Sequence, residues 1–234
     1  MATPIVFLHG FAGTPRHWDR VLASLAPGRF EPIALDITQA DPLTPDGVAA
    51  LVAASTPERF IIAGYSMGGR LALHAALAMA DRVSRLVLVS ASAGIDDPAA
   101  RAARRAADDA LADSIEGDSI DSFVERWSAV ALFEGDPGWV KDEVALEERR
   151  CAPGVLAQCL RTLGPGAMEP MWGRLGELRM AAAVLAGERD SAYVAAGRRL
   201  AAALGDATLA VVAGAGHRLA LEAPVAIADA LGRG

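Results

Sequence analysis

A serine flanked by glycines is the first feature of this chain that could carry chemistry. The segment GYSMG, residues 64–68, follows an apolar run and precedes a helical pattern. This spacing is typical of a nucleophile elbow, in which a strained strand-to-helix turn projects the Ser66 hydroxyl above a sheet. Glycines beside the serine avoid clashes that a Cβ atom would cause. Five residues can match by chance, so a base and an acid must be found elsewhere.

The base and the acid are indicated by chain order. His217 stands in GAGH, after the last apolar run and before a final helical pattern, and Asp190 stands in LAGERD after the preceding run. An elbow serine is followed along the chain first by its acid and then by its histidine. Taken singly, Asp190 could be a helix cap and His217 a surface residue. All three at strand ends predict a Ser-His-Asp triad.

An oxyanion site is expected beside this triad. The loop FLHGFAGT, residues 7–14, follows the first apolar run. Such a loop turns backbone N–H groups toward the serine, and we predict the amides of Phe11 and Met67 as the donors. One such donor typically lowers a reaction barrier by about 3 kcal/mol. His9 is then a loop-shaping residue and not a second base.

A cation stands four residues after the serine. Arg70 lies one helical turn past Ser66, so both can face one pocket. A neutral ester needs no such partner, whereas a guanidinium binds a carboxylate bidentately. The formal net charge of −7 repels anions at long range, so an anionic ligand requires a local cluster of arginines. We therefore expect a ligand that carries a carboxylate.

The elements that must position these residues alternate along the chain. Apolar runs without polar alternation suit parallel strands covered on both faces, and the helical patterns between them imply right-handed crossovers. We therefore predict an α/β fold with a doubly wound, mostly parallel sheet. Residues 96–178 show no strand pattern and are expected to form a helical lid inserted into a core of residues 1–95 and 179–234. The predicted strands are Pro4–Gly10, Glu31–Ile37, Arg59–Ser66, Arg85–Ala91, Ala181–Glu188 and Ala207–Gly216.

Composition narrows the class of protein. Hydrophobic residues make up 53% of the 234 residues and charged residues 22%, which argues against disorder. The acidic balance argues against a nucleic-acid partner. Two cysteines do not form a disulfide framework, and no signal peptide or membrane-spanning run is visible. We expect a cytoplasmic enzyme without cofactor or metal, and no oligomeric state is predicted.

Over essentially its whole length the chain resembles the α/β-hydrolase superfamily. The segment GYSMGGR is similar to one branch, the MenH-type 2-succinyl-6-hydroxy-2,4-cyclohexadiene-1-carboxylate synthase (SHCHC synthase) of menaquinone and phylloquinone biosynthesis. The similarity continues in order through RAARRAADDALA, FVERWSAVALF, ERRCAPGVLAQCLRTLGPGAMEPMW, LAGERDSAY and AGHRLALEAP. This run of segments is far more specific than the serine motif alone.

The resemblance implies a lyase. Enzymes of that branch eliminate pyruvate from 2-succinyl-5-enolpyruvyl-6-hydroxy-3-cyclohexene-1-carboxylate. It implies that Ser66 acts as a general base, made more basic by His217 and Asp190, and is not acylated. The anion formed would be delocalised into a carbonyl held by the oxyanion amides.

The resemblance also implies a small-molecule polycarboxylate substrate and a set of residues that bind it. Arg70 corresponds to a carboxylate-binding arginine, and Tyr65 and Trp127 correspond to pocket residues. Arg104 and Arg150 correspond to lid arginines. A slip of one residue along each helix would exchange them for their neighbours, at positions 105 and 149.

The chain also departs from the branch and leaves alternatives open. Arg218 follows His217 where a small or polar residue is expected, and LALEAP is unusually apolar. The first alternative is a serine hydrolase, an esterase or thioesterase, that is acylated by a carboxylate-bearing substrate. The second is a non-catalytic binding protein of the same fold, against which an intact triad argues.

Overall fold

A six-stranded sheet forms the centre of the computed structural model, which describes residues 2–232. Within these residues all strands run parallel, in the order β2-β1-β3-β4-β5-β6. The prediction of a doubly wound α/β sheet is confirmed, and the predicted ends differ from the observed ones by a few residues. The strands are β1 (Thr3–Leu8), β2 (Phe30–Leu35), β3 (Phe60–Tyr65), β4 (Val83–Val89), β5 (Ala181–Gly187) and β6 (Ala207–Val212).

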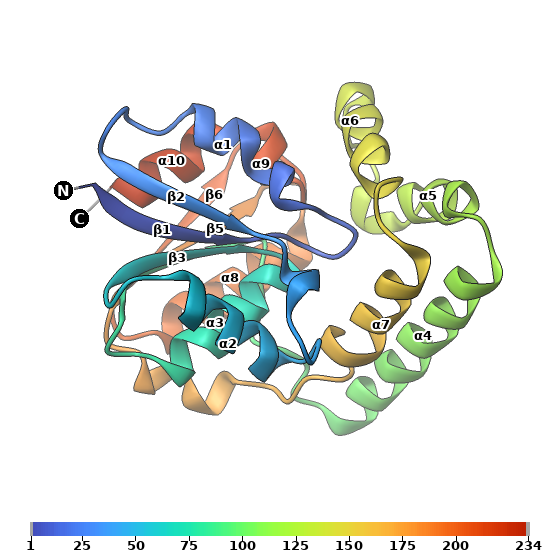
Figure 1. Ribbon diagram of the computed structural model, residues 1–234, viewed down its shortest axis with the longest axis horizontal. Helices are drawn as coiled ribbons and strands as arrows, with labels where there is room; N and C mark the ends of the chain where they lie inside the picture. Colours follow the sequence, from blue (N-terminus) through green and yellow to red (C-terminus); the bar gives the residue numbers. More distant parts are fainter. Residues whose placement is uncertain (1, 233–234) are drawn as a thin grey trace.

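Helices cover both faces of the sheet (Figure 1). Side chains alternate between the two faces along each strand: Val6 and Leu8 pack with α2 and α3, whereas Ile5 and Phe7 pack with α1 and α10. Both sets are buried, which explains the continuous apolar runs. The helices on the first face are α2 (Pro45–Ser55), α3 (Met67–Ala78) and α8 (Ser191–Ala203), and those on the second are α1 (Asp19–Ala23), α9 (Leu219–Glu222) and α10 (Pro224–Gly232).

The strand order reverses beside β1. The chain passes from β1 to β2 at one edge and then returns to build β3, β4, β5 and β6 on the other side. The loop after β1 and the turn after β3 therefore leave the sheet side by side at its carboxyl end. Open α/β sheets bind ligands at this switch point, and it is here that the predicted oxyanion loop and Ser66 lie.

The chain between β4 and β5 contains helices only. Helices α4 to α7 lie beyond the carboxyl ends of the strands, whereas η4 returns to pack against α3 and α8 (Figure 1). We call residues 98–177 the helical insertion. Its inner side packs Ile115, Phe123 and Leu156 around Phe11 of the loop after β1. The insertion consists of α4 (Pro98–Gly117), α5 (Ile120–Ser128), η3 (Ala131–Phe133), α6 (Gly138–Glu148), α7 (Pro153–Leu163) and η4 (Trp172–Glu177); two short turns elsewhere are η1 (Pro15–Trp18) and η2 (Ile37–Gln39).

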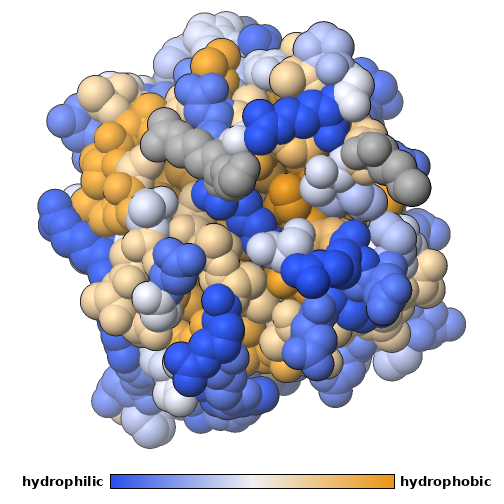
Figure 2. All heavy atoms as spheres, turned by 90° about the vertical axis from the view of Figure 1, so that its left-hand side faces the viewer, coloured by the Kyte–Doolittle hydropathy of each residue, from blue (hydrophilic) through white to orange (hydrophobic). Residues whose placement is uncertain are grey.

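The opposite end of the sheet carries the chain termini. On that face charged and apolar residues are interspersed (Figure 2). Within residues 2–232, none of the helices combines the length and the apolar character that crossing a membrane requires. Cys151 and Cys159 are both free thiols. The predicted serine, the loop after β1 and the insertion thus lie at the end of the sheet away from the termini.

Candidate active site

Ser66 occupies a strained turn between β3 and α3. Its φ of 53° lies in the left-handed region that non-glycine residues rarely adopt. Its own N–H donates to the Val89 carbonyl at 2.9 Å, which ties the turn to β4. A Cβ atom on Gly64 would lie 2.2 Å from the Gly68 carbonyl oxygen, and one on Gly68 would lie 2.1 Å from that of Leu8. Both glycines are thus required by close backbone packing, which is why the motif has this spacing.

The structure brings the three predicted triad side chains into one chain of hydrogen bonds. His217 Nε2 lies 3.1 Å from Ser66 Oγ, and His217 Nδ1 lies 2.6 Å from Asp190 Oδ2. Because a carboxylate can only accept at neutral pH, Nδ1 donates to Asp190 and leaves Nε2 as the acceptor for the serine proton. The other carboxylate oxygen accepts the Tyr193 N–H, so Asp190 also begins α8 as its cap.

Aromatic rings surround the imidazole of His217, which is buried. The ring centres of Tyr193, Tyr65 and Phe133 lie 4.5, 5.3 and 6.0 Å from that of His217. Tyr65 is itself stacked on His17 at 4.6 Å. The Ser90 hydroxyl donates to the His217 carbonyl at 2.9 Å. The imidazole is therefore held on three sides and by its own backbone, with its free edge toward Ser66.

Above Ser66 lies a cavity between the sheet and the helical insertion, here called the Ser66 cavity. Both predicted oxyanion residues line it, Phe11 from the loop after β1 and Met67 from the first turn of α3. Tyr65 and Trp127 also line it, and the Trp127 ring packs edge-on against Phe11. The complete lining is Phe11, Tyr65, Ser66, Met67, Arg70, Arg104, Asp108, Leu111, Trp127, Leu132, Phe133, Leu160, Gly164, Pro165, Tyr193 and His217.

Arg70 lines this cavity but lies deeper than its position in the first turn of α3 suggested. Only 4% of its surface is exposed. Its guanidinium donates to the Leu163 carbonyl at 2.8 Å and contacts the Met168 sulfur at 3.2 Å. Within residues 2–232 Arg70 forms no ion pair. Burial, assisted by nearby Arg104 and opposed by Tyr193 and Asp108, lowers its pKa to about 10. The cavity thus contains a buried guanidinium without a direct ion-pair partner among the described residues.

The second cation of the cavity is Arg104, from α4. Its side chain pairs with Asp108, one turn further along the helix, at 2.8 Å. Arg105 points away, pairs with exposed Asp109 and does not line the cavity. Between the two arginines proposed from the sequence, the helix therefore presents Arg104 to Ser66. Two guanidiniums and one carboxylate leave this region with a net positive charge.

Arg150 lies elsewhere. It follows the end of α6, is 58% exposed at its side chain and pairs with Glu147. It lines a neighbouring cavity with Asp36 and Thr38, on the far side of the loop after β1. Its neighbour Arg149 is also outside the Ser66 cavity and pairs with Asp121. The expected third carboxylate-binding arginine is thus absent from the described lining of the Ser66 cavity.

Sequence reasoning missed eight of the residues that line the cavity, and three of them, Asp108, Phe133 and Tyr193, bring a charge or a ring to it. A signal existed for Asp108, because it stands four residues after Arg104 on the same helix. Tyr193 could have been placed near the triad because it stands three residues after Asp190, where a helix-capping aspartate accepts a backbone N–H. Phe133 carried no signal, since its place depends on how η3 is folded against the core.

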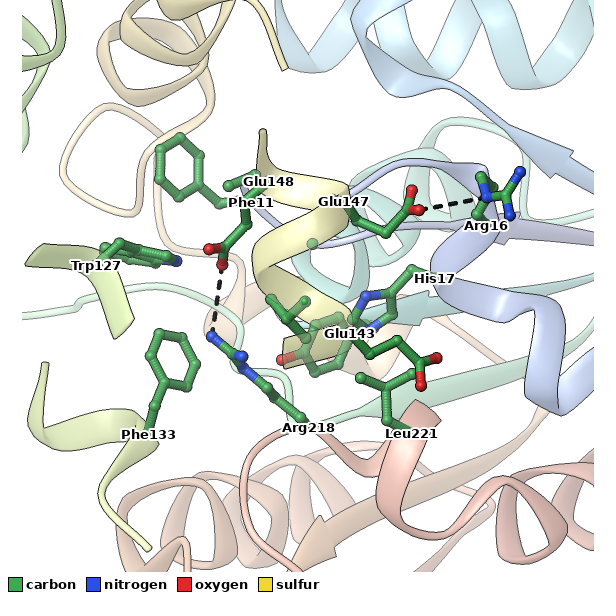
Figure 3. Close-up of a pocket in the computed structure, with 15 residues that line it drawn as sticks. Phe11, Arg16, His17, Trp127, Phe133, Glu143, Glu147, Glu148, Arg218 and Leu221 are labelled. Carbon is green, nitrogen blue, oxygen red and sulfur yellow. Dashed lines mark hydrogen bonds and ion pairs between the residues drawn. The ribbon is translucent and has the colours of Figure 1, made fainter. Parts of the chain in front are cut away.

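Arg218 was noted from the sequence only as a departure, and its surroundings are unusual. It is 3% exposed and lies between two buried carboxylates, Asp136 Oδ2 at 3.3 Å and Glu148 Oε1 at 3.5 Å. It borders a second cavity, in which Figure 3 shows Arg218 pointing toward Glu148. Burial, opposed by Arg218, raises the pKa of Glu148 to about 7, and burial also raises the pKa of Asp136.

We expect Glu148→Gln to flatten the pH dependence of stability. The folded-state pKa of about 7 exceeds the unfolded value near 4.5, so the folded state binds more protons between these pH values. The free energy of unfolding contributed by Glu148 is therefore greatest below pH 4.5 and falls as the pH rises to 7, by about 3 kcal/mol in all. Urea unfolding at pH 5 and pH 7.5 measures this.

The comparison is made with the wild-type chain, in which Arg218 and Arg149 face the same carboxyl group. These charges remain in the variant, so their contributions cancel in the difference. A variant with the same loss of stability between the two pH values as the wild type would show that Glu148 does not titrate in this window.

Among residues 2–232 no cluster of three or more histidine, cysteine, aspartate or glutamate side chains could hold a metal ion. The strained serine, the imidazole and the carboxylate instead define a site for proton transfer or acyl transfer.

Comparison with known proteins agrees with this fold. Residues 5–230 match the alpha/beta hydrolase family, and the chain belongs to it. It is an enzyme of that superfamily.

Individual relatives indicate a narrower group within this family. The structure of MenH from S. aureus superimposes with a TM-score of 0.90 and 26% sequence identity, over 98% of this chain and 91% of that one. The 2-succinyl-6-hydroxy-2,4-cyclohexadiene-1-carboxylate synthase of Salmonella paratyphi C is 26% identical, over 98% of this chain and 92% of that protein. Protein PHYLLO, chloroplastic, of Arabidopsis thaliana is 28% identical over 97% of this chain, but the chain spans only 15% of that protein's length. The similarity to SHCHC synthases therefore extends through the insertion as well as the core.

Proposed function

We propose that the protein is an SHCHC synthase, a cytoplasmic lyase that eliminates pyruvate from 2-succinyl-5-enolpyruvyl-6-hydroxy-3-cyclohexene-1-carboxylate. The observation that carries this proposal is Arg70, a buried guanidinium that lines the same cavity as Ser66 and forms no ion pair with a described residue. A buried cation is costly unless it is paired, so the site favours a ligand that brings a carboxylate. The near full-length similarity to a synthase of this name supports the choice of substrate.

In the proposed reaction Ser66 Oγ removes a ring proton while its own proton passes to His217 Nε2. Asp190, hydrogen-bonded to Nδ1, stabilises the imidazolium that forms. The electrons of the broken C–H bond move through the ring and expel the enolpyruvyl oxygen, so that the C–O bond breaks and a ring double bond forms. The released enolpyruvate takes up the proton on carbon and becomes pyruvate. No water is consumed.

Negative charge develops on a substrate carbonyl oxygen during this proton removal. The backbone amides of Phe11 and Met67, whose residues line the cavity beside Ser66, are proposed to donate to that oxygen. Arg70 and Arg104 are proposed to bind two of the substrate carboxylates, with Tyr65 and Trp127 as walls of the pocket. We leave Arg150 out of this set because it borders a different cavity.

A serine hydrolase acting on a carboxylate-bearing ester is the second candidate. The distance of 3.1 Å between Ser66 Oγ and His217 Nε2 suits nucleophilic attack as well as general-base catalysis. The two reactions differ in their use of water and in whether Ser66 becomes acylated.

The test is to supply the enolpyruvyl substrate, made in situ, to the purified protein. Pyruvate is followed by coupling to lactate dehydrogenase, and the ring product is weighed by mass spectrometry. We expect pyruvate together with the cyclohexadiene. A ring product heavier by one water would indicate hydrolysis of the enol ether, and the absence of pyruvate would exclude the synthase assignment.

A further inference from the structure

Arg218 joins the catalytic core to the helical insertion. It directly follows His217 in the chain, yet among residues 2–232 its ion pairs and its ring contact are all with the insertion: the ring of Phe133, whose centre is 3.9 Å away, and the carboxylates of Asp136 and Glu148. These residues stand at the end of η3, in the turn that follows it and at the last residue of α6. One side chain thus holds three points of the insertion at the position next to the base.

The contact with Phe133 leads back to the reacting groups. The Phe133 ring lines the Ser66 cavity and lies 6.0 Å from the imidazole of His217, and it packs edge-on against Trp127 at 5.5 Å. Figure 3 shows the guanidinium of Arg218 between Phe133 and Glu148. A shift of Arg218 would therefore move a wall of the cavity where it meets the catalytic imidazole.

A second arginine, next to the triad acid Asp190, binds the turn that follows η3. Arg189 immediately precedes Asp190, donates to the Gly135 carbonyl and pairs with Glu222. The neighbours in sequence of both Asp190 and His217 are therefore bound to residues 135 and 136 of the insertion. The position of η3 over the site is coupled to the acid and to the base separately.

Arg218 itself is not available to a substrate anion. Two buried carboxylates surround it, and their combined charge equals or exceeds that of the guanidinium. Arg70 differs, since it has no ion-pair partner among the described residues. The two buried arginines near the site therefore have different tasks.

We propose that Arg218 is a positioning residue, which fixes η3 and α6 relative to His217 and so places Phe133 against the catalytic imidazole. It acts through Phe133 and the two carboxylates and does not touch the substrate. Lysine at this position would keep the charge but would lose the planar guanidinium that stacks on a ring while reaching two carboxylates at once.

Hydrogen exchange tests the positioning without reference to the reaction. In Arg218→Lys and in Asp136→Asn we expect amides of residues 131–148 to exchange about tenfold faster, while β3 and α3 remain unchanged. The matched control is Arg20→Met. Arg20 also joins the core to α6 through one carboxylate, Glu143, and one ring, Trp139, but this pair is exposed. Arg20→Met should leave residues 131–137 unchanged.

Enzyme kinetics then test whether Arg218 acts through Phe133. This second experiment rests on the proposed function, because it measures pyruvate release. Arg218→Lys and Phe133→Leu should each lower kcat/KM about tenfold for pyruvate release, and the double variant should lose little more than the worse single variant. Losses that multiply to about a hundredfold would mean that the two residues act independently. Unchanged exchange in residues 131–148, or faster exchange throughout the core, would overturn the proposal whatever the reaction is.

Discussion

Replacement of Ser66 with alanine is expected to lower kcat for pyruvate release by about 10³-fold or more. The variant removes the oxygen that takes the ring proton, and His217 Nε2, placed 3.1 Å from that oxygen, does not reach into its position. Removal of one member of a Ser-His-Asp triad typically abolishes most of its rate enhancement, because the three groups act as a unit. Initial rates from the coupled pyruvate assay, with active protein quantified by mass, measure the loss.

Two controls show whether the loss is specific to Ser66 and whether Ser66 is acylated. Ser24→Ala removes a surface hydroxyl that donates only to the Arg20 carbonyl, and it should retain full activity. Intact-mass spectra of the wild-type protein during turnover should show no adduct on Ser66. An acyl-enzyme that accumulates and decays at the rate of turnover would favour the hydrolase over the lyase.

Substitution of Arg70 is expected to have the second largest effect. Arg70→Met keeps the length and the apolar packing of the buried side chain but removes the charge, and it should lower kcat/KM by roughly 10² to 10⁴-fold for the carboxylate substrate. Truncation of one partner in a buried charge-assisted pair costs several kcal/mol, mainly because the other charge is left unpaired. Arg70→Lys should recover little, since an ammonium cannot supply the bidentate fork.

The controls for Arg70 distinguish binding of the substrate carboxylate from a structural role of this side chain. Arg105→Ala removes an exposed arginine that lies outside the cavity and should change kcat/KM less than twofold, as expected for a surface ion pair. Any side activity of Arg70→Met toward a small neutral aryl ester should fall less than tenfold, because Ser66, His217 and the amides remain. Equal losses on both substrates would assign Arg70 a structural role at the turn after β3.

The sequence predicted the fold because its signals are local. Apolar runs without polar alternation predict the strands of a parallel sheet, and each of the six appears. The four inner strands are largely buried, whereas the edge strands β2 and β6 are partly exposed. The spacing of Gly64, Ser66 and Gly68 is required by two close backbone approaches. One lies within the turn, between Gly64 and Gly68, and the other lies between Gly68 and the end of β1. Chain order alone then selected Asp190 and His217, which the structure brings to hydrogen-bonding distance of each other and of Ser66.

Only the tertiary structure decided which insertion residues reach the cavity. Neighbouring residues on a helix point about 100° apart, so Arg104 and Arg105 could not be separated until α4 was packed against α7. Arg150 follows α6, and the packing of that helix turns it away from Ser66. The burial of Arg218 between Asp136 and Glu148 joins positions far apart in the chain, and no local pattern contains that information. The sequence by itself determined the sheet and the chemical groups at its carboxyl end, whereas long-range packing of the insertion decided which charges face the substrate.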